Sequence, residues 1–135
     1  MNRVQFRSLK PDELVWETRP HGDGEPARHV AELSEALGAG QVRANIWRYE
    51  PGAAGRRHVH AEQEETFVVL SGRLSLYVGD QPERVDVPAG GVMHIEAGTP
   101  LQTANHGADD LVVYVYGAPP DEGAEVLSSA VETGP

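Results

Sequence analysis

Short apolar runs separated by turn residues dominate the chain from residue 42 onward. Each run is four to eight residues long and is bounded by Gly, Pro, Asp or Asn. This spacing is typical of strands in a sandwich or barrel, and it leaves no room for a long helix. The pattern predicts an all-β domain whose strands cover Val42–Tyr49, Arg57–Ala61, Glu65–Leu70, Arg73–Val78, Arg84–Val87, Val92–Glu96, Leu101–Asn105 and Leu111–Tyr116.

The segments on either side of these runs have a different composition. Residues 1–41 carry scattered prolines and glycines, and we expect them to form an N-terminal arm of the same domain. Within this arm, Val30–Leu37 has apolar residues at helical spacing before Gly38, which predicts a possible short helix. Residues 118–135 contain Pro119-Pro120, acidic residues and few apolar ones, so we expect a tail that is partly disordered. The barrel itself is expected to span residues 42–117.

Two histidines with one residue between them give the clearest chemical signal. Residues i and i+2 of a strand share a face, so His58 and His60 can point at one spot. A carboxylate from the next strand can reach the same spot, and two imidazoles with one carboxylate bind divalent metals. Glu64 and Glu65 compete for this role, and strand parity favours Glu65. We expect a divalent Fe, Mn, Zn or Ni ion on His58, His60 and Glu65.

The spacing of these residues resembles the first motif of the cupin family. That motif reads G-x5-H-x-H-x3,4-E-x6-G, and this chain matches it with Gly52, His58, His60, Glu65 and Gly72. The resemblance implies a double-stranded β-helix, or jelly roll, and a small single-domain protein. It also implies that the three residues bind metal. Cupins include dioxygenases, sugar-phosphate isomerases, decarboxylases and polyketide cyclases, so the family alone does not choose a reaction.

The second cupin motif, G-x5-P-x-G-x2-H-x3-N, is matched only in part. Gly90, Gly98 and Asn105 fall in register, whereas Leu101 stands where the last metal-ligating histidine belongs. Glu96 likewise replaces the proline. A different register would let His94 act as the fourth ligand, but its spacing fits less well. We therefore expect Leu101 at the histidine position, with open coordination positions on the metal.

Strand parity also predicts the residues around the ligand pocket. We expect mostly apolar side chains and one hydroxyl to form its wall: Trp47, Tyr49, Phe67, Met93, Ile95, Leu101 and Thr103. The core strands show no cluster of Lys and Arg, which disfavours a phosphorylated sugar. A small, largely apolar molecule with an oxygen function that binds metal is the expected ligand.

Composition excludes several partners. The net charge of −10 disfavours nucleic acid, and no segment is apolar enough to span a bilayer. The absence of cysteine is consistent with a cytoplasmic protein. We also expect a homodimer in which the arm covers a neighbour's sheet edge. The apolar residues of the arm are Val4, Phe6, Leu9, Leu14, Val15 and Trp16.

Two functions remain open on the sequence. One is a metal-dependent enzyme with a dioxygenase-, isomerase- or cyclase-like reaction, for which no catalytic residue beyond the metal ligands can be assigned. The other is a non-catalytic module that binds a small molecule or a metal, which the loss of the fourth ligand at Leu101 would suit.

Overall fold

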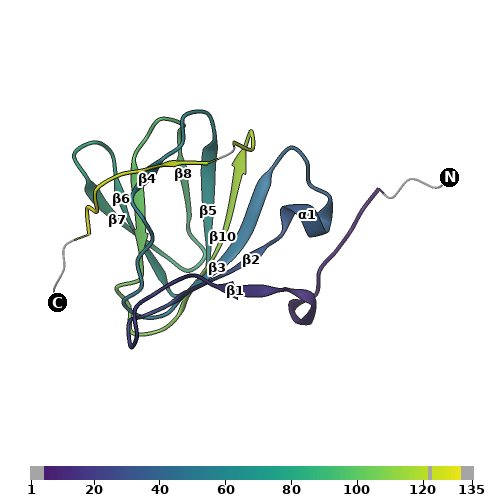
Figure 1. Ribbon diagram of the computed structural model, residues 1–135, viewed down its shortest axis with the longest axis horizontal. Helices are drawn as coiled ribbons and strands as arrows, with labels where there is room; N and C mark the ends of the chain where they lie inside the picture. The colour runs from purple at the N-terminus through teal and green to yellow at the C-terminus, as the bar shows by residue number, and fades with distance from the viewer. Residues whose placement is uncertain (1–4, 122, 132–135) are drawn as a thin grey trace.

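Two antiparallel sheets contain all the strands of the computed structural model, which describes residues 5–121 and 123–131 (Figure 1). The larger sheet has the strand order β1 (Trp16–Thr18), β2 (Arg28–Glu32), β3 (Arg43–Tyr49), β10 (Leu111–Ala118), β5 (Glu64–Ser71) and β8 (Val92–Ile95). The smaller sheet has the order β11 (Glu125–Val126), β4 (His58–Val59), β9 (Leu101–Ala104), β6 (Arg73–Val78) and β7 (Glu83–Pro88). One 3-10 turn, η1 (Pro11–Glu13), and one helix, α1 (Ser34–Leu37), complete the described elements.

The eight strands expected from residue 42 onward are all present, which confirms the all-β fold class. Their ends differ from the prediction by only one or two residues, except that β4 pairs over two residues alone. The turn at Ser71-Gly72 requires glycine, because Gly72 has a φ of +78° and a Cβ there would lie 2.6 Å from the Asp110 carbonyl oxygen. The apolar core lies between the two sheets and is centred on Leu74, Leu76, Leu111 and Val113.

The expected helix at Val30–Leu37 is mostly wrong. Residues 28–32 form β2, which pairs with β3, and only Ser34–Leu37 is helical. Val30 and Ala31 are almost fully buried in the sheet, and this burial outweighs the helical spacing of a short run. Gly38 does end the helix, in the left-handed conformation. The arm thus extends the barrel's own sheet through β2 and β1; Val4 lies outside the described residues.

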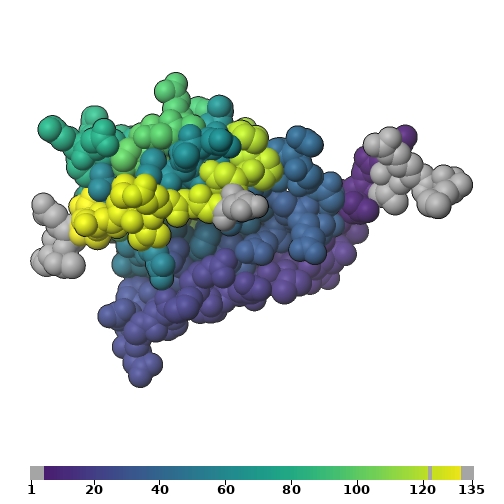
Figure 2. All heavy atoms as spheres, turned by 45° about the horizontal axis from the view of Figure 1, so that its top comes forward, coloured from purple at the N-terminus to yellow at the C-terminus, as the bar shows by residue number. Residues whose placement is uncertain are grey.

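The described part of the C-terminal tail is attached to the smaller sheet. Strand β11 pairs with β4, and the backbone N–H of Leu127 donates to the Arg57 carbonyl at 2.8 Å. Further along, Oε1 of the buried Gln102 accepts hydrogen bonds from the backbone N–H groups of Ala130 and Val131. Figure 2 shows this segment, in yellow, lying along the surface of the barrel. Residues 122 and 132–135 of the expected tail lie outside the described residues.

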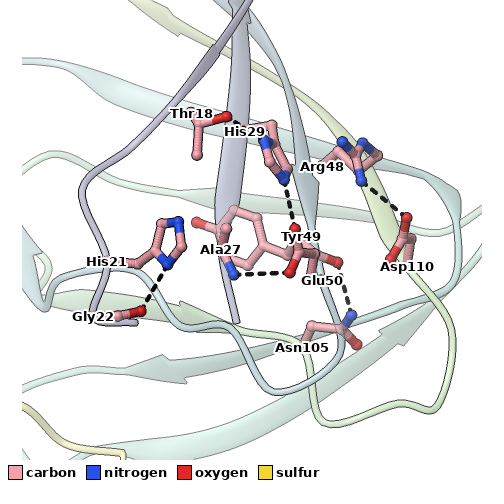
Figure 3. A network of polar contacts seen from close by, with 10 residues as sticks. All are labelled: Thr18, His21, Gly22, Ala27, His29, Arg48, Tyr49, Glu50, Asn105 and Asp110. Carbon is pink, nitrogen blue, oxygen red and sulfur yellow. Dashed lines mark hydrogen bonds and ion pairs between the residues drawn. The ribbon is translucent and has the colours of Figure 1, made fainter. Parts of the chain in front are cut away.

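A polar network holds the C-terminal end of β3, at Tyr49 and Glu50 (Figure 3). The Asn105 amide donates to the carbonyls of Tyr49 and Asp109, both at 2.9 Å, and it is 1% exposed. On the opposite face, His29 contacts Glu50 at 2.8 Å and Thr18 at 2.8 Å. The asparagine of the second motif therefore has a structural role here, because it holds the backbone at Tyr49.

The helices of the described residues include none that is both long and apolar enough to cross a bilayer.

Candidate metal centre and ligand cavity

His58, His60 and Glu65 meet on the inner side of the barrel. His58 lies on β4, His60 follows that strand, and Glu65 is the second residue of β5. One ligand atom from each residue lies within 4.8 Å of the other two. The Nε2 atoms of His58 and His60 are 3.6 and 3.3 Å from Glu65 Oε1. This is the cluster that the H-x-H spacing predicts.

Hydrogen bonds on the far side of each imidazole ring set its orientation. Nδ1 of His58 is 2.8 Å from the Arg56 carbonyl oxygen, which can only accept a hydrogen bond. Nδ1 of His60 is 3.0 and 3.1 Å from the two carboxylate oxygens of Asp121. A neutral imidazole that donates from Nδ1 has a free lone pair on Nε2. Both lone pairs therefore face Glu65, as in protein metal sites whose histidines are held by an outer acceptor.

Glu65 is a buried carboxylate with an unused oxygen. Among the described residues, Oε1 has no hydrogen-bond partner, since its contacts with the two Nε2 atoms lack hydrogen-bond geometry. Burial alone would raise the pKa of Glu65, but the neighbouring His58 and His60 outweigh it and lower this pKa to about 2. Glu65 in turn raises the pKa of His60. An ionised, buried oxygen within 3.3 and 3.6 Å of two imidazole nitrogens fits a divalent cation.

The two alternative ligands lie on the outer face of the larger sheet. Glu64 is exposed, and its Oε1 is 3.0 Å from Nε2 of His94. Nδ1 of His94 is 2.7 Å from the hydroxyl of Thr66. Glu65 and Glu64 are adjacent in a strand, so only one of them can face inward. The inward residue is Glu65, and the contacts of His94 place it outside the cluster.

Asp121 is a site residue that the sequence did not reveal. It lies 61 residues after His60, in the segment expected to be a tail, and no motif marks it. Its backbone N–H lies 3.4 Å from the Gln63 amide oxygen. Gln63 itself packs so closely over Gly117 that a Cβ there would be 2.7 Å from its amide group. The chain thus uses Gln63 and a glycine to bring Asp121 to His60.

A cavity of about 360 Å³ opens beside the three residues, near the lower end of the usual range for small-molecule sites. Four of the seven expected pocket residues line it, namely Trp47, Tyr49, Phe67 and Thr103. Val113 and Val115 add apolar surface from β10, and Val126 adds more from β11. The hydroxyl groups of Tyr49 and Thr103 are 2.6 Å apart and form a hydrogen bond.

Met93, Ile95 and Leu101 are not among the residues that line this cavity, which corrects the prediction for them. Ile95 and Leu101 belong to the buried core, and Met93 packs against it. Alternation along a strand assigns a side chain to the inner face but does not decide whether it borders the cavity. Met93, Ile95 and Leu101 are the cross-strand partners of Phe67, Glu65 and His58, which line the cavity, yet they pack into the core instead. Leu101 is nevertheless the cross-strand partner of His58, so the two residues share a face of the smaller sheet.

Three arginines line the cavity, so the expectation of no basic cluster there is wrong. Arg28 comes from β2, Arg43 from the start of β3, and Arg56 precedes β4. Sequence reasoning missed Arg28 because it placed that residue in an arm outside the barrel. The argument against phosphorylated ligands rested on this absence, and it no longer holds.

Comparison with known proteins agrees with this geometry. Residues 45–117 match the family model described as "Cupin domain". No match was found among curated proteins. A sugar phosphate isomerase of the cupin superfamily from Silicibacter pomeroyi is 27% identical, with 83% of this chain and 75% of that chain covered and a TM-score of 0.69.

Two further solved structures share the fold at lower identity. The polyketide cyclase RemF from Streptomyces resistomycificus is 17% identical, with 92% and 87% of the two chains covered and a TM-score of 0.73. A protein with a double-stranded β-helix domain from Klebsiella pneumoniae is 24% identical, with 91% and 98% covered and a TM-score of 0.70. The motif residues, the two-sheet barrel and the family match lead to one conclusion: this chain belongs to the cupin family.

Proposed function

We propose that this cupin binds a divalent metal through His58, His60 and Glu65 and acts on a small oxygen-bearing organic molecule in the adjoining cavity. The observation that carries the proposal is the buried Oε1 of Glu65, which faces two imidazole Nε2 atoms and has no hydrogen-bond partner among the described residues. A divalent ion held there would act as a Lewis acid toward an oxygen of the bound molecule.

The cavity walls support a molecule with a large apolar part. Phe67, Val113 and Val115 present apolar surface next to the metal ligands. Burying about 100 Å² of a ring against such surface contributes roughly 2.5 kcal/mol. The same cavity is lined by the Tyr49–Thr103 hydroxyl pair, which can offer the ligand one hydrogen bond. The proposed ligand is an enol, catechol, β-diketone or carboxylate with a mainly apolar body.

A non-catalytic binding module is the second candidate, and one observation favours it. Leu101 lies directly across from His58, where the resemblance to cupins places another histidine ligand. Three protein ligands bind a metal less tightly than four, and a ligand-sensing protein can use a site that releases its metal.

A thermal-shift screen tests the proposal. The metal-loaded protein, the chelator-treated protein and His60→Ala are each mixed with small chelating acids, enols and catechols. Compounds should stabilise only the metal-loaded wild-type protein, and His94→Ala, which changes the outer-face histidine, should behave as wild type. Equal stabilisation of the chelator-treated protein would contradict a metal-dependent site. Mass spectrometry of each stabilising compound after incubation then distinguishes an enzyme, which changes the compound, from a binding module, which does not.

A further inference from the structure

We infer that Arg28, with the hydroxyls of Tyr49 and Thr103, forms an anion-binding subsite in the cavity, so that the ligand carries a carboxylate or phosphate group as well as its metal-binding oxygen. This inference rests on the proposed function, because it names the class of molecule that the same cavity takes.

Arg28 faces the cavity because of its place in the larger sheet. It is the cross-strand partner of Tyr49, and directly opposed residues share a face. Its guanidinium carbon lies 5.3 Å from the centre of the Trp47 ring and 5.8 Å from that of the Tyr49 ring. Contacts with two aromatic rings hold the planar group in place while leaving its N–H donors available.

Arg28 has no acidic partner in the described part of the chain. The arginines that pair with carboxylates there are Arg19, Arg48 and Arg84. Arg43 and Arg56, which also line the cavity, form no such pair within the same residues. Arg43 and Arg56 are exposed to solvent, whereas Arg28 is partly buried against two aromatic rings. A partly buried guanidinium without an acidic partner, in a protein with a net charge of −10, indicates a site for an anion.

Gly55 shows where these donors converge. A Cβ on Gly55 would lie 2.6 Å from the Thr103 hydroxyl, 3.0 Å from the Tyr49 hydroxyl and 3.7 Å from a terminal nitrogen of Arg28. The absence of a side chain at residue 55 therefore lets both hydroxyls pack against the backbone there, and all three groups border the same space of the cavity. The two hydroxyls share one hydrogen bond, so whichever oxygen accepts it still has its own O–H to donate.

An anion in this space would receive charge-assisted hydrogen bonds from the guanidinium and one from a hydroxyl. Guanidinium groups bind carboxylate and phosphate in the same forked geometry. The structure therefore indicates an anion of either kind, and the test must distinguish a carboxylate from a phosphate.

The test compares three hydroxamates with the same metal-binding group. Acetohydroxamate carries no anionic group besides the hydroxamate. Succinic monohydroxamate adds a carboxylate, and phosphonoacetohydroxamate adds a phosphonate. Their affinities are measured by calorimetry on protein loaded with Zn²⁺ or Ni²⁺. We expect at least one anionic compound to bind wild type about 10- to 100-fold more tightly than acetohydroxamate. The better of the two identifies the anion.

Variants assign that preference to the subsite. Arg28→Gln should remove it, and Gly55→Ala should reduce it because the added methyl group would displace the Tyr49 and Thr103 hydroxyls. Arg73→Gln, which removes an exposed arginine of β6 that does not line the cavity, is the matched control. Arg28→Lys, which keeps the charge, should retain part of the preference and provides a second variant if Arg28→Gln does not fold.

The outcomes separate this inference from the proposed function. Binding of acetohydroxamate without any anionic preference, or a preference that survives Arg28→Gln, would overturn the subsite and leave the metal site intact. If the metal or acetohydroxamate does not bind, the proposed function fails, and the subsite is tested on metal-free protein with inorganic phosphate and propionate. If phosphate or propionate binds and the binding depends on Arg28, the subsite is supported although the proposed function has failed. If neither compound binds, the subsite and the proposed function are both overturned.

Discussion

The carboxylate of Asp121 contacts Nδ1 of His60 at 3.0 and 3.1 Å, across 61 residues of sequence. This contact connects the C-terminal segment to the candidate metal centre. It fixes the imidazole ring with Nε2 toward Glu65, and it makes the segment after the barrel part of the site.

Removing the Asp121 carboxylate should weaken metal binding. Asp121→Ala leaves His60 free to rotate and less basic, and loss of such an outer partner typically reduces metal affinity about 10- to 100-fold. Competition with a chromogenic chelator measures the change. Glu125→Gln alters an exposed carboxylate of the same segment and should leave the affinity as it is. Equal affinities for wild type and Asp121→Ala would show that the contact does not support the site.

The stability of the metal-free protein should depend on pH through Glu65 and His60. Glu65 has its pKa lowered from 4.5 to about 2, so its contribution is present above pH 4.5 and is lost as pH falls toward 2. His60 has its pKa raised above 6.5, so its contribution is present below pH 6.5 and is lost as pH rises through the raised value. The stabilisation should be greatest between these two ordinary pKa values.

Thermal unfolding of metal-free wild type and Glu65→Gln across pH 2 to 9 checks this expectation. The difference in unfolding temperature between wild type and Glu65→Gln should be largest between pH 4.5 and 6.5 and should shrink toward pH 2 and pH 9. Glu62→Gln, at an exposed position nearby, should show no such dependence. A difference for Glu65→Gln that stays constant with pH would contradict the pairing.

Restoring a histidine at residue 101 should tighten the metal site. Leu101 is the cross-strand partner of His58 and is 1% exposed, so an imidazole there could add a fourth protein ligand. Leu101→His should therefore lose metal to a chelator more slowly than wild type, whereas Leu101→Met should not. The metal-free form of Leu101→His should unfold more easily, by about 1–3 kcal/mol, because it buries an unpaired polar ring. Unchanged retention would mean that the side chain at this position does not face the metal.

We expect the chain to form a homodimer through the outer edge of the larger sheet. Strand β1 is the edge strand there, and the neighbouring Val15 and Trp16 are 76% and 41% exposed. Light scattering should give twice the chain mass of 14.6 kDa, and Trp16→Glu should shift it toward the monomer. A wild-type mass of one chain at micromolar concentration would refute this expectation.

The sequence predicts the all-β class and the cluster of His58, His60 and Glu65 because both depend on strand alternation, whereas the jelly-roll barrel follows from the resemblance to cupins. His58 and His60 are two residues apart, so they share a face of an extended strand whatever the exact bounds of that strand. On β5, alternation places Glu65 on the inner face and Glu64 on the outer face. The eight strands follow from apolar runs and turn residues in the same way.

Other features depend on contacts that no local pattern encodes. Alternation could not tell that Ile95 and Leu101 pack into the core instead of lining the cavity. Strands β1 and β11 have three and two residues, too few to show a period, so their pairing depends on the rest of the sheet. Arg28 lies on β2 and Asp121 follows β10, both in segments expected to lie outside the barrel, and both were therefore missed.

Elemental analysis of the protein purified without chelator or added metal tests the central claim most directly. Wild type should contain close to one divalent metal ion per chain, and His58→Ala should lose most of it, while His94→Ala keeps it. Absence of metal from wild type, or the same stoichiometry in His58→Ala, would contradict a metal centre at His58, His60 and Glu65.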